Sequence, residues 1–327
     1  MVSTNDISIN IDLNETENFC KKSLINYEIV QDMLSLSCLV YNFNISIKTE
    51  MCSESKMFDL DNLKIDTMVF DSKKQAILNN ILSKSPNCEL HKFYDLESGT
   101  QVGVAVSHKM KRISIIFRGS NELVDWMHNL LICKQRLPNG KYIHQGFYKS
   151  LFMCDLYYKL RNDFTNLTKK YPDYEVYVSG HSLGGGLATL FSYFISNITE
   201  KNITLITFAS PRVGNKNWAD DFNSRKNLRH YRFVNQKDIV TSIPYFYFHH
   251  VGNCIEINTN NEIKYSIFDI HKDIQNIFKY FNIFDHLIEN YYSNLLKCKW
   301  KNDYIHCKYD EKVKNEKKID IDNKIMV

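Results

Sequence analysis

The pattern most able to do chemistry is the pentapeptide 180–184, Gly-His-Ser-Leu-Gly, which has the form G-x-S-x-G. It is typical of a nucleophile elbow, where a serine stands on a sharp turn between a strand and a helix. The apolar run 176–178 precedes the motif and a small, apolar segment follows it, as a strand and a helix would. Glycines are needed because side chains two positions from the serine would collide with neighbouring elements. We therefore predict that Ser182 is a nucleophile; the alternative is a glycine-rich turn with a solvated serine.

A serine nucleophile needs donors for the negative charge that develops on the attacked carbonyl oxygen. One donor is expected from the backbone N–H of Leu183, at the start of the helix that follows the elbow. A second must come from the loop after an earlier strand, and Ser120 lies just beyond the apolar run 112–117. The sequence thus predicts an oxyanion hole formed by Leu183 and Ser120, with an ordinary surface turn at 117–120 as the alternative.

In a hydrolase with this elbow, an acid and then a histidine follow the serine along the chain. Asp238 comes just after the predicted strand 229–234, at the carboxyl end where the sites of α/β proteins lie. Its competitors Asp220 and Asp221 precede that strand and fall within a predicted helix. We therefore predict Asp238 as the acid.

The base must be a histidine downstream of the acid, and the candidates are His249, His250, His271 and His286. The first two are expected in or beside a strand at 250–257, shortly after Asp238. A long segment separates that strand from His286, so the chain has room to return over the elbow. We predict His286 as the base and expect its neighbour Asp285 to cap the following helix.

The elements around these residues alternate between strands and helices. Strands are expected at 101–107, 112–117, 175–179, 204–208, 229–234 and 250–257, and helices at 19–44, 74–83, 147–171 and 184–198. This alternation predicts an α/β fold with a mostly parallel central sheet and helices on both faces. We expect one domain over residues 19–307, a flexible N-terminus over 1–18 and a charged, disordered tail over 308–327.

Composition limits the function classes. The chain has 327 residues, 44% of them hydrophobic, and a formal net charge of +4, which does not suggest a nucleic-acid-binding protein. No secretory signal and no transmembrane segment are expected. The nine cysteines are scattered without a C-x-x-C pair, as in a cytosolic protein with reduced thiols and no zinc site. We expect a cytoplasmic location, peripheral at membranes, and neither a metal nor an organic cofactor.

Five segments, in this order, resemble the class 3 lipases, which include fungal triacylglycerol lipases. They are F-R-G-S at 117–120 followed by D-W at 125–126, H-Q-G-F at 144–147, G-H-S-L-G-G at 180–185, F-A-S-P-R-V-G at 208–214, and R-F-V-N at 232–235 leading to Asp238. The resemblance covers roughly residues 94–296, and His286 stands in a D-H-L turn like that of the family. It implies an α/β-hydrolase fold and a Ser182-Asp238-His286 triad. Asn129 departs from the aspartate of several members, outside the triad.

The resemblance also implies the reaction: hydrolysis of lipid esters through an acyl-enzyme, as in an acylglycerol lipase of lipid degradation. The expected partner is a lipid ester at a membrane or droplet surface. A phospholipase A1, a non-lipid esterase and a catalytically silent lipase-like scaffold stay open as alternatives. In such lipases a lid follows the oxyanion residue, and 122–133 is apolar enough to form one, with Leu123, Trp126 and Met127 as lid or substrate contacts. The alternative is a plain surface helix.

Overall fold

The computed structural model describes residues 25–41, 56–57, 88–96, 99–119, 133–257, 260, 263–266 and 283–298. Within these residues the centre is a nine-stranded sheet with the strand order β1-β2-β3-β4-β7-β8-β9-β10-β11. Its strands are β1 (Lys56–Met57), β2 (Glu89–Asp95), β3 (Gln101–Ser107), β4 (Arg112–Phe117), β7 (Glu175–His181), β8 (Ile203–Phe208), β9 (Leu228–Asn235), β10 (Asn253–Ile257) and β11 (Ile263–Ser266). A separate hairpin joins β5 (Lys134–Arg136) to β6 (Tyr142–His144).

The middle of the sheet is parallel. The pairs β4–β7, β7–β8, β8–β9 and β9–β10 are parallel. The pairs β1–β2, β2–β3, β3–β4 and β10–β11 are antiparallel. The register places Phe117 opposite Gly180, His181 opposite Phe208, and Phe208 opposite Phe233. The carboxyl ends of β4, β7, β8 and β9 therefore meet at one edge of the sheet, where a site is expected.

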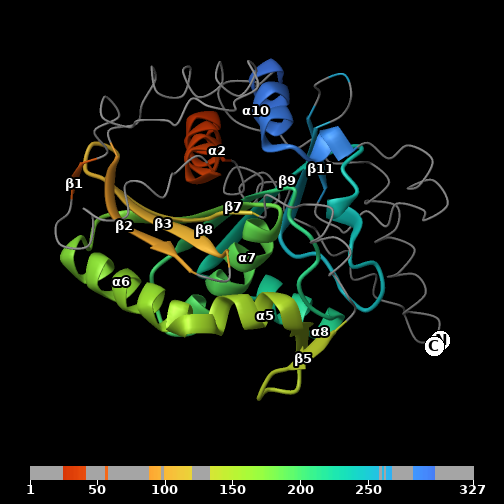
Figure 1. The fold of residues 1–327 in the computed structure, drawn as a ribbon, viewed down its shortest axis with the longest axis horizontal. Coiled ribbons are helices and arrows are strands. Elements are labelled where there is room, and N and C mark those ends of the chain that lie inside the picture. Colours follow the sequence, from red (N-terminus) through yellow and green to blue (C-terminus); the bar gives the residue numbers. More distant parts are fainter. Residues whose placement is uncertain are drawn as a thin grey trace, which may run out of the picture.

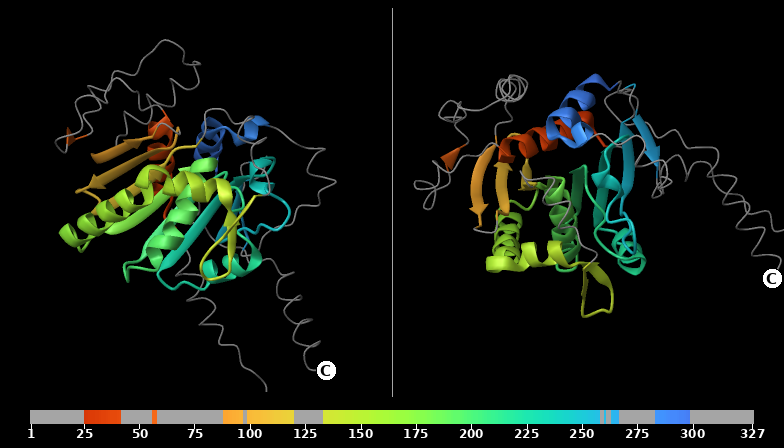
Figure 2. Two further views of the ribbon diagram at one scale, coloured as in Figure 1. Left: turned by 60° about the horizontal axis from the view of Figure 1, so that its bottom comes forward. Right: turned by 45° about the vertical axis from the view of Figure 1, so that its right-hand side comes forward.

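Helices cover both faces (Figures 1 and 2). One face carries α2 (Tyr27–Tyr41) and α10 (Ile288–Lys297); the other carries α5 (Gln145–Phe152), α6 (Leu156–Lys170), α7 (Leu183–Ser196) and α8 (Lys216–Asn223). Successive side chains of a strand point to opposite faces of the sheet. Phe117 packs in the core beneath α7, and its neighbour Ile116 packs in the core beneath α2. The predicted fold class is confirmed.

Most predicted elements are confirmed, several with their ends shifted by a residue or two, but the helix predicted over 19–44 begins only at Tyr27. The predicted helix 147–171 is wrong as one helix, because it is broken between α5 and α6 by η4 (Met153–Asp155), where Cys154 and Asp155 have φ of 51° and 59°. Leu151 and Leu156 would point to different sides of one straight helix, and the break lets both reach the core. The predicted strand 250–257 begins only at Asn253.

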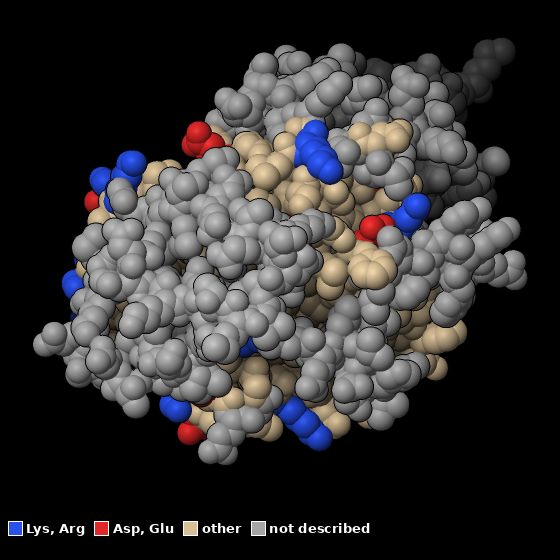
Figure 3. Space-filling view, turned by 45° about the horizontal axis from the view of Figure 1, so that its top comes forward, with Lys and Arg blue, Asp and Glu red and all other residues tan. Residues whose placement is uncertain are grey.

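Among the predicted segments, the helix 74–83, the N-terminus 1–18 and the tail 308–327 lie outside the described residues. The single-domain boundaries 19–307 therefore stay a prediction. In the part of the chain that is described, no helix combines the length and the apolar character needed to cross a bilayer. On the face seen in Figure 3, the described acidic and basic side chains are interspersed with uncharged ones.

Candidate active site

The elbow is built by the junction of β7 and α7. The strand ends at His181 and the helix begins at Leu183, so Ser182 alone makes the turn, with φ 57° and ψ −127°. Its N–H donates to the carbonyl of Phe208 on β8 at 3.0 Å, and its own carbonyl accepts from the N–H of Gly186 at 3.2 Å. A positive φ is costly for a residue with a side chain, and surrounding contacts must hold it.

The two motif glycines make this turn fit. A Cβ at Gly180 would overlap the carbonyl oxygen of Gly184, and a Cβ at Gly184 would overlap that of Phe117 at the end of β4. These are backbone atoms, which cannot move aside as a flexible side chain could. The predicted collision is therefore confirmed, and it explains why both positions need glycine.

Ser182, Asp238 and His286 meet above the carboxyl ends of the central strands. His286, at the end of η6 (Ile283–His286), lies with Nε2 2.8 Å from Ser182 Oγ. Its Nδ1 lies 2.9 Å and 3.0 Å from the two carboxylate oxygens of Asp238. A carboxylate only accepts, so Nδ1 carries the proton and Nε2 is left to accept from the serine hydroxyl. All three residues are at most 2% exposed, so water does not weaken this arrangement.

Asp238 is held by two further donors. The backbone N–H of Val240 in η5 (Val240–Ser242) donates to Oδ1 at 2.9 Å, and the hydroxyl of Tyr291 on α10 donates to Oδ2 at 2.7 Å. Both oxygens are thus occupied, and the carboxylate is fixed toward His286. The arrangement can transfer a proton from a serine hydroxyl to an imidazole whose cationic form is stabilised by a buried carboxylate.

Comparison with known proteins agrees with this geometry. The model of the family described as Lipase (class 3) matches residues 114–248. Those residues include Ser182 and Asp238, and over them the chain is similar to the class 3 lipases.

Individual relatives extend the comparison. The lipase of Rhizomucor miehei is 32% identical over 174 residues, which are 50% of this chain and 46% of that protein. A chloroplastic phospholipase A(1) of Arabidopsis thaliana is 29% identical over 151 residues, 40% of this chain and 33% of the relative. The native propeptide complex of Rhizomucor miehei lipase superimposes with a TM-score of 0.61 at 23% identity, covering 81% of both chains, which shows the α/β-hydrolase fold. The chain spans about half the length of the curated relatives it matches.

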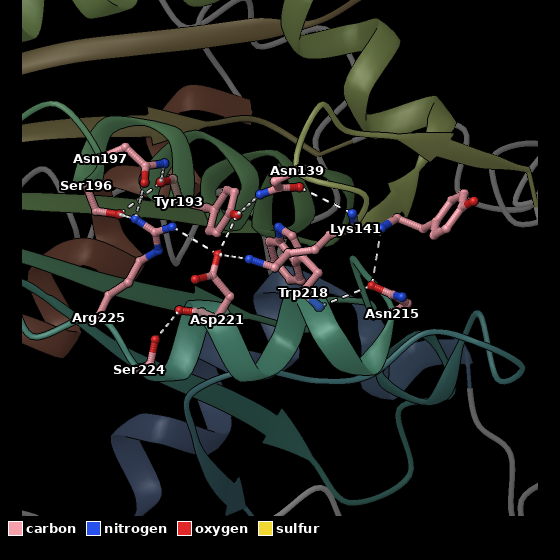
Figure 4. Close-up of polar contacts among 11 residues, drawn as sticks. Asn139, Lys141, Tyr193, Ser196, Asn197, Asn215, Trp218, Asp221, Ser224 and Arg225 are labelled. Carbon is pink, nitrogen blue, oxygen red and sulfur yellow. Dashed lines mark hydrogen bonds and ion pairs between the residues drawn. The ribbon is translucent and has the colours of Figure 1, made fainter.

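The competing aspartates lie elsewhere in the structure. Asp220 and Asp221 are on α8, as predicted, and Figure 4 shows Asp221 as the centre of a polar cluster. Its carboxylate accepts from Tyr193 at 2.6 Å, from Lys141 at 2.9 Å and from Arg225 at 3.1 Å. Burial acts in the opposite direction, but these bonds lower the pKa of Asp221 to about 2. The contacts tie α8 to α7 and to the β5–β6 hairpin.

The other histidine candidates can also be placed. His249 pairs through its backbone with Gly214, and the His250 ring is hydrogen-bonded to the Thr241 carbonyl, both in the segment before β10. His271 lies outside the described residues. The expectation that Asp285 caps α10 is wrong: the N-cap is Leu287, without a side-chain cap bond, and the Asp285 carbonyl accepts instead from Asn235 Nδ2 at 2.8 Å.

Of the predicted oxyanion donors, Leu183 is described. As the first residue of α7, its N–H has no acceptor within the helix and is available at the elbow. Ser120 and the predicted lid residues Leu123, Trp126 and Met127 lie outside the described residues. The structure describes the strand end as far as Gly119.

Sequence reasoning missed three residues that surround the triad. Tyr291 contacts Asp238, and Tyr41 on α2 reaches His181, the residue before the nucleophile. No motif marks either tyrosine among the chain's 20, because each acts through a contact between distant segments. The position of His181 inside G-H-S-L-G was visible in the sequence, although nothing there indicated its partners.

Proposed function

We propose that this protein is a serine hydrolase of the class 3 lipase type that cleaves carboxylic esters of lipids, as an acylglycerol lipase does, through an acyl-enzyme. The observation that carries the proposal is the 2.8 Å separation of His286 Nε2 from Ser182 Oγ, with Asp238 on the other ring nitrogen. A nucleophile, a base and an orienting acid in this order are what ester cleavage by acyl transfer requires.

In the proposed reaction, His286 takes the hydroxyl proton of Ser182 while Oγ attacks the ester carbonyl carbon. The carbonyl oxygen becomes negative and is stabilised by the N–H groups of Leu183 and Ser120. His286 then gives the proton to the departing alcohol oxygen, which leaves an ester between the acyl group and Ser182. Water, deprotonated by His286, attacks this ester; the acid is released and the serine recovers its proton. Asp238 stays ionised and stabilises the imidazolium.

Apolar side chains beside the base support a lipid substrate. Phe284 and Leu287, on either side of His286, are 64% and 39% exposed. Exposed apolar residues next to a buried polar centre suit a substrate with a hydrocarbon chain. Acylglycerol hydrolysis is the main proposal; phospholipase A1 activity is the second candidate, because a phospholipase A(1) is among the relatives of the same region.

The decisive test uses a fluorophosphonate probe and a panel of acylglycerol, phospholipid and short soluble esters. Ser182→Ala should abolish labelling and lower ester hydrolysis by at least about a thousandfold while the protein stays folded. Ser224→Ala, which changes an exposed serine at the C-cap of α8, is the matched control and should leave both unchanged. Folded wild-type protein that neither labels nor hydrolyses any ester would identify a silent scaffold instead.

Two further parts of the proposal concern surroundings of the enzyme. If residues 122–133 form a lid, the rate on long-chain esters should rise once the substrate aggregates, and equal rates below and above aggregation would indicate an open site.

A cytoplasmic location, peripheral at membranes, is supported by the scattered pattern of nine cysteines. Cell fractionation tests it.

A further inference from the structure

A chain of hydrogen bonds runs beneath the site from α2 to the backbone of the base. The Tyr41 hydroxyl, on the last residue of α2, lies 2.8 Å from Nδ1 of His181. Nε2 of the same ring lies 2.7 Å from the carbonyl oxygen of His286. A carbonyl only accepts, so Nε2 of His181 carries a proton and donates it there.

The direction of the other bond follows from the charge of His181. Burial first, and the neighbouring His286 second, lower the pKa of His181 well below its ordinary value, so the ring is neutral. A neutral ring with its proton on Nε2 must accept at Nδ1, and the donor is the Tyr41 hydroxyl. Burial also raises the pKa of Tyr41, which keeps that hydroxyl protonated. Tyr41 therefore selects the tautomer that can bind the His286 carbonyl.

The Tyr41 hydroxyl has a second contact, at the end of β4. It lies against Gly119, the residue before the predicted oxyanion donor Ser120. A Cβ at Gly119 would overlap this hydroxyl and would come within 2.7 Å of the His181 carbonyl oxygen. Only glycine leaves room for the tyrosine, so the close approach is a built feature of this strand end.

One hydroxyl thus joins three segments that catalysis needs in register: the strand end before Ser120, the elbow, and the turn that carries His286. The rings of His181 and His286 lie 4.9 Å apart between centroids, so a shift of one would move the other. Tyr41 belongs to α2, outside the segment 114–248 that matches the family model.

We propose that Tyr41 and His181 are a positioning pair, which fixes the turn of His286 and the strand end at Gly119 relative to Ser182. The proposal rests on the proposed function, since it concerns the geometry of that same site. A base held slightly off its productive position lowers the rate of the chemical step strongly, whereas substrate binding depends on other surfaces.

The first experiment compares Tyr41→Phe with Tyr177→Phe in the full chain, with rates expressed per folded molecule. The control also deletes a tyrosine hydroxyl bond in the same core, that of Tyr177 to Glu175 at 2.8 Å, at the opposite end of β7 from Ser182. Tyr41→Phe should lower kcat and the fluorophosphonate labelling rate roughly ten- to hundredfold with KM within about twofold, and the control should keep wild-type values. Equal rates for the two variants would overturn the proposal.

A second experiment at His181 separates positioning from packing. Glutamine offers both a donor for the His286 carbonyl and an acceptor for Tyr41, whereas phenylalanine fills aromatic space without either. We expect His181→Gln to retain most of the activity and His181→Phe to lose about as much as Tyr41→Phe. A folded His181→Phe enzyme more active than His181→Gln would show that the ring acts by packing alone. Wild-type protein inactive on every ester would instead refute the proposed function.

Discussion

The Tyr291 hydroxyl donates to Oδ2 of Asp238 at 2.7 Å and accepts from the backbone N–H of Asn235 at 2.9 Å. Tyr291 lies on α10, the helix that directly follows the turn of His286. One element therefore places the base and restrains the acid that orients it. The acid, in turn, is tied to the end of β9 through the same hydroxyl.

Tyr291→Phe should leave the ring packing intact but remove one of the donors to Asp238. Because the carboxylate is then less firmly held, we expect kcat to fall by about tenfold with KM little changed. The matched control is Tyr292→Phe, which removes the neighbouring hydroxyl on the same helix, away from Asp238. Steady-state kinetics on a soluble ester would measure both, and equal kcat values would show that the Tyr291 hydroxyl does not position the acid.

Acid should destabilise the protein through buried histidines that are neutral in the folded state, among them His230 and His250. Burial, and then the charge of Arg232, hold the pKa of His230 well below its ordinary value; burial, Arg232 and Arg212 do the same for His250. Below about pH 6.5 the unfolded chain binds protons at these positions and the folded protein does not. The free energy of unfolding should thus decrease as the pH is lowered, by up to about 1.4 kcal/mol per pH unit for each histidine.

Urea unfolding between pH 7.5 and 5 measures this slope. His230→Gln removes one of these groups and should make the dependence of the unfolding free energy on pH less steep, even if the variant is less stable at neutral pH. An unchanged slope in this variant would mean that His230 takes up its proton in the folded state.

Gly184→Ala should disrupt the elbow, because the new methyl group would overlap the backbone carbonyl of Phe117. We expect a loss of stability of about 1–3 kcal/mol and a large loss of fluorophosphonate labelling in the folded fraction. Gly103→Ala on β3 is the control, since its Cβ would lie 3.4 Å from the nearest atom, a Val40 methyl group. Thermal unfolding and labelling of both variants test the claim; full labelling of Gly184→Ala would refute it.

Asp221→Asn should lower stability and leave the chemical step unchanged. The three donors to this carboxylate (Figure 4) hold the pKa of Asp221 at about 2, so its contribution is present above pH 4 and lost toward pH 2. Removing the charge should cost on the order of 1–2 kcal/mol. Asp220→Asn, beside it and paired with the exposed Lys216, should stay within about 0.5 kcal/mol. A selective loss of kcat in Asp221→Asn would contradict this and indicate that Asp221 takes part in catalysis.

The sequence by itself determined the local structure around the nucleophile. A strand, a glycine-flanked serine and a helix are contiguous, so backbone sterics and hydrophobic pattern suffice to predict the elbow at Ser182. The strands 101–107 and 112–117 were predictable for the same reason, since the first alternates around three valines and the second is a short apolar run. The order of acid and histidine along the chain narrowed the remaining candidates to a few side chains.

Only the tertiary structure decided what surrounds those side chains. Tyr41 and His181 are 140 positions apart, and Tyr291 and Asp238 are 53 apart, so their contacts exist only once α2 and α10 pack on the sheet. The break at Cys154 was hidden because a local apolar pattern continues across it, and the core on both sides imposed it. The N-cap of α10 is Leu287 rather than Asp285, because the turn that brings His286 to Ser182 sets where that helix begins.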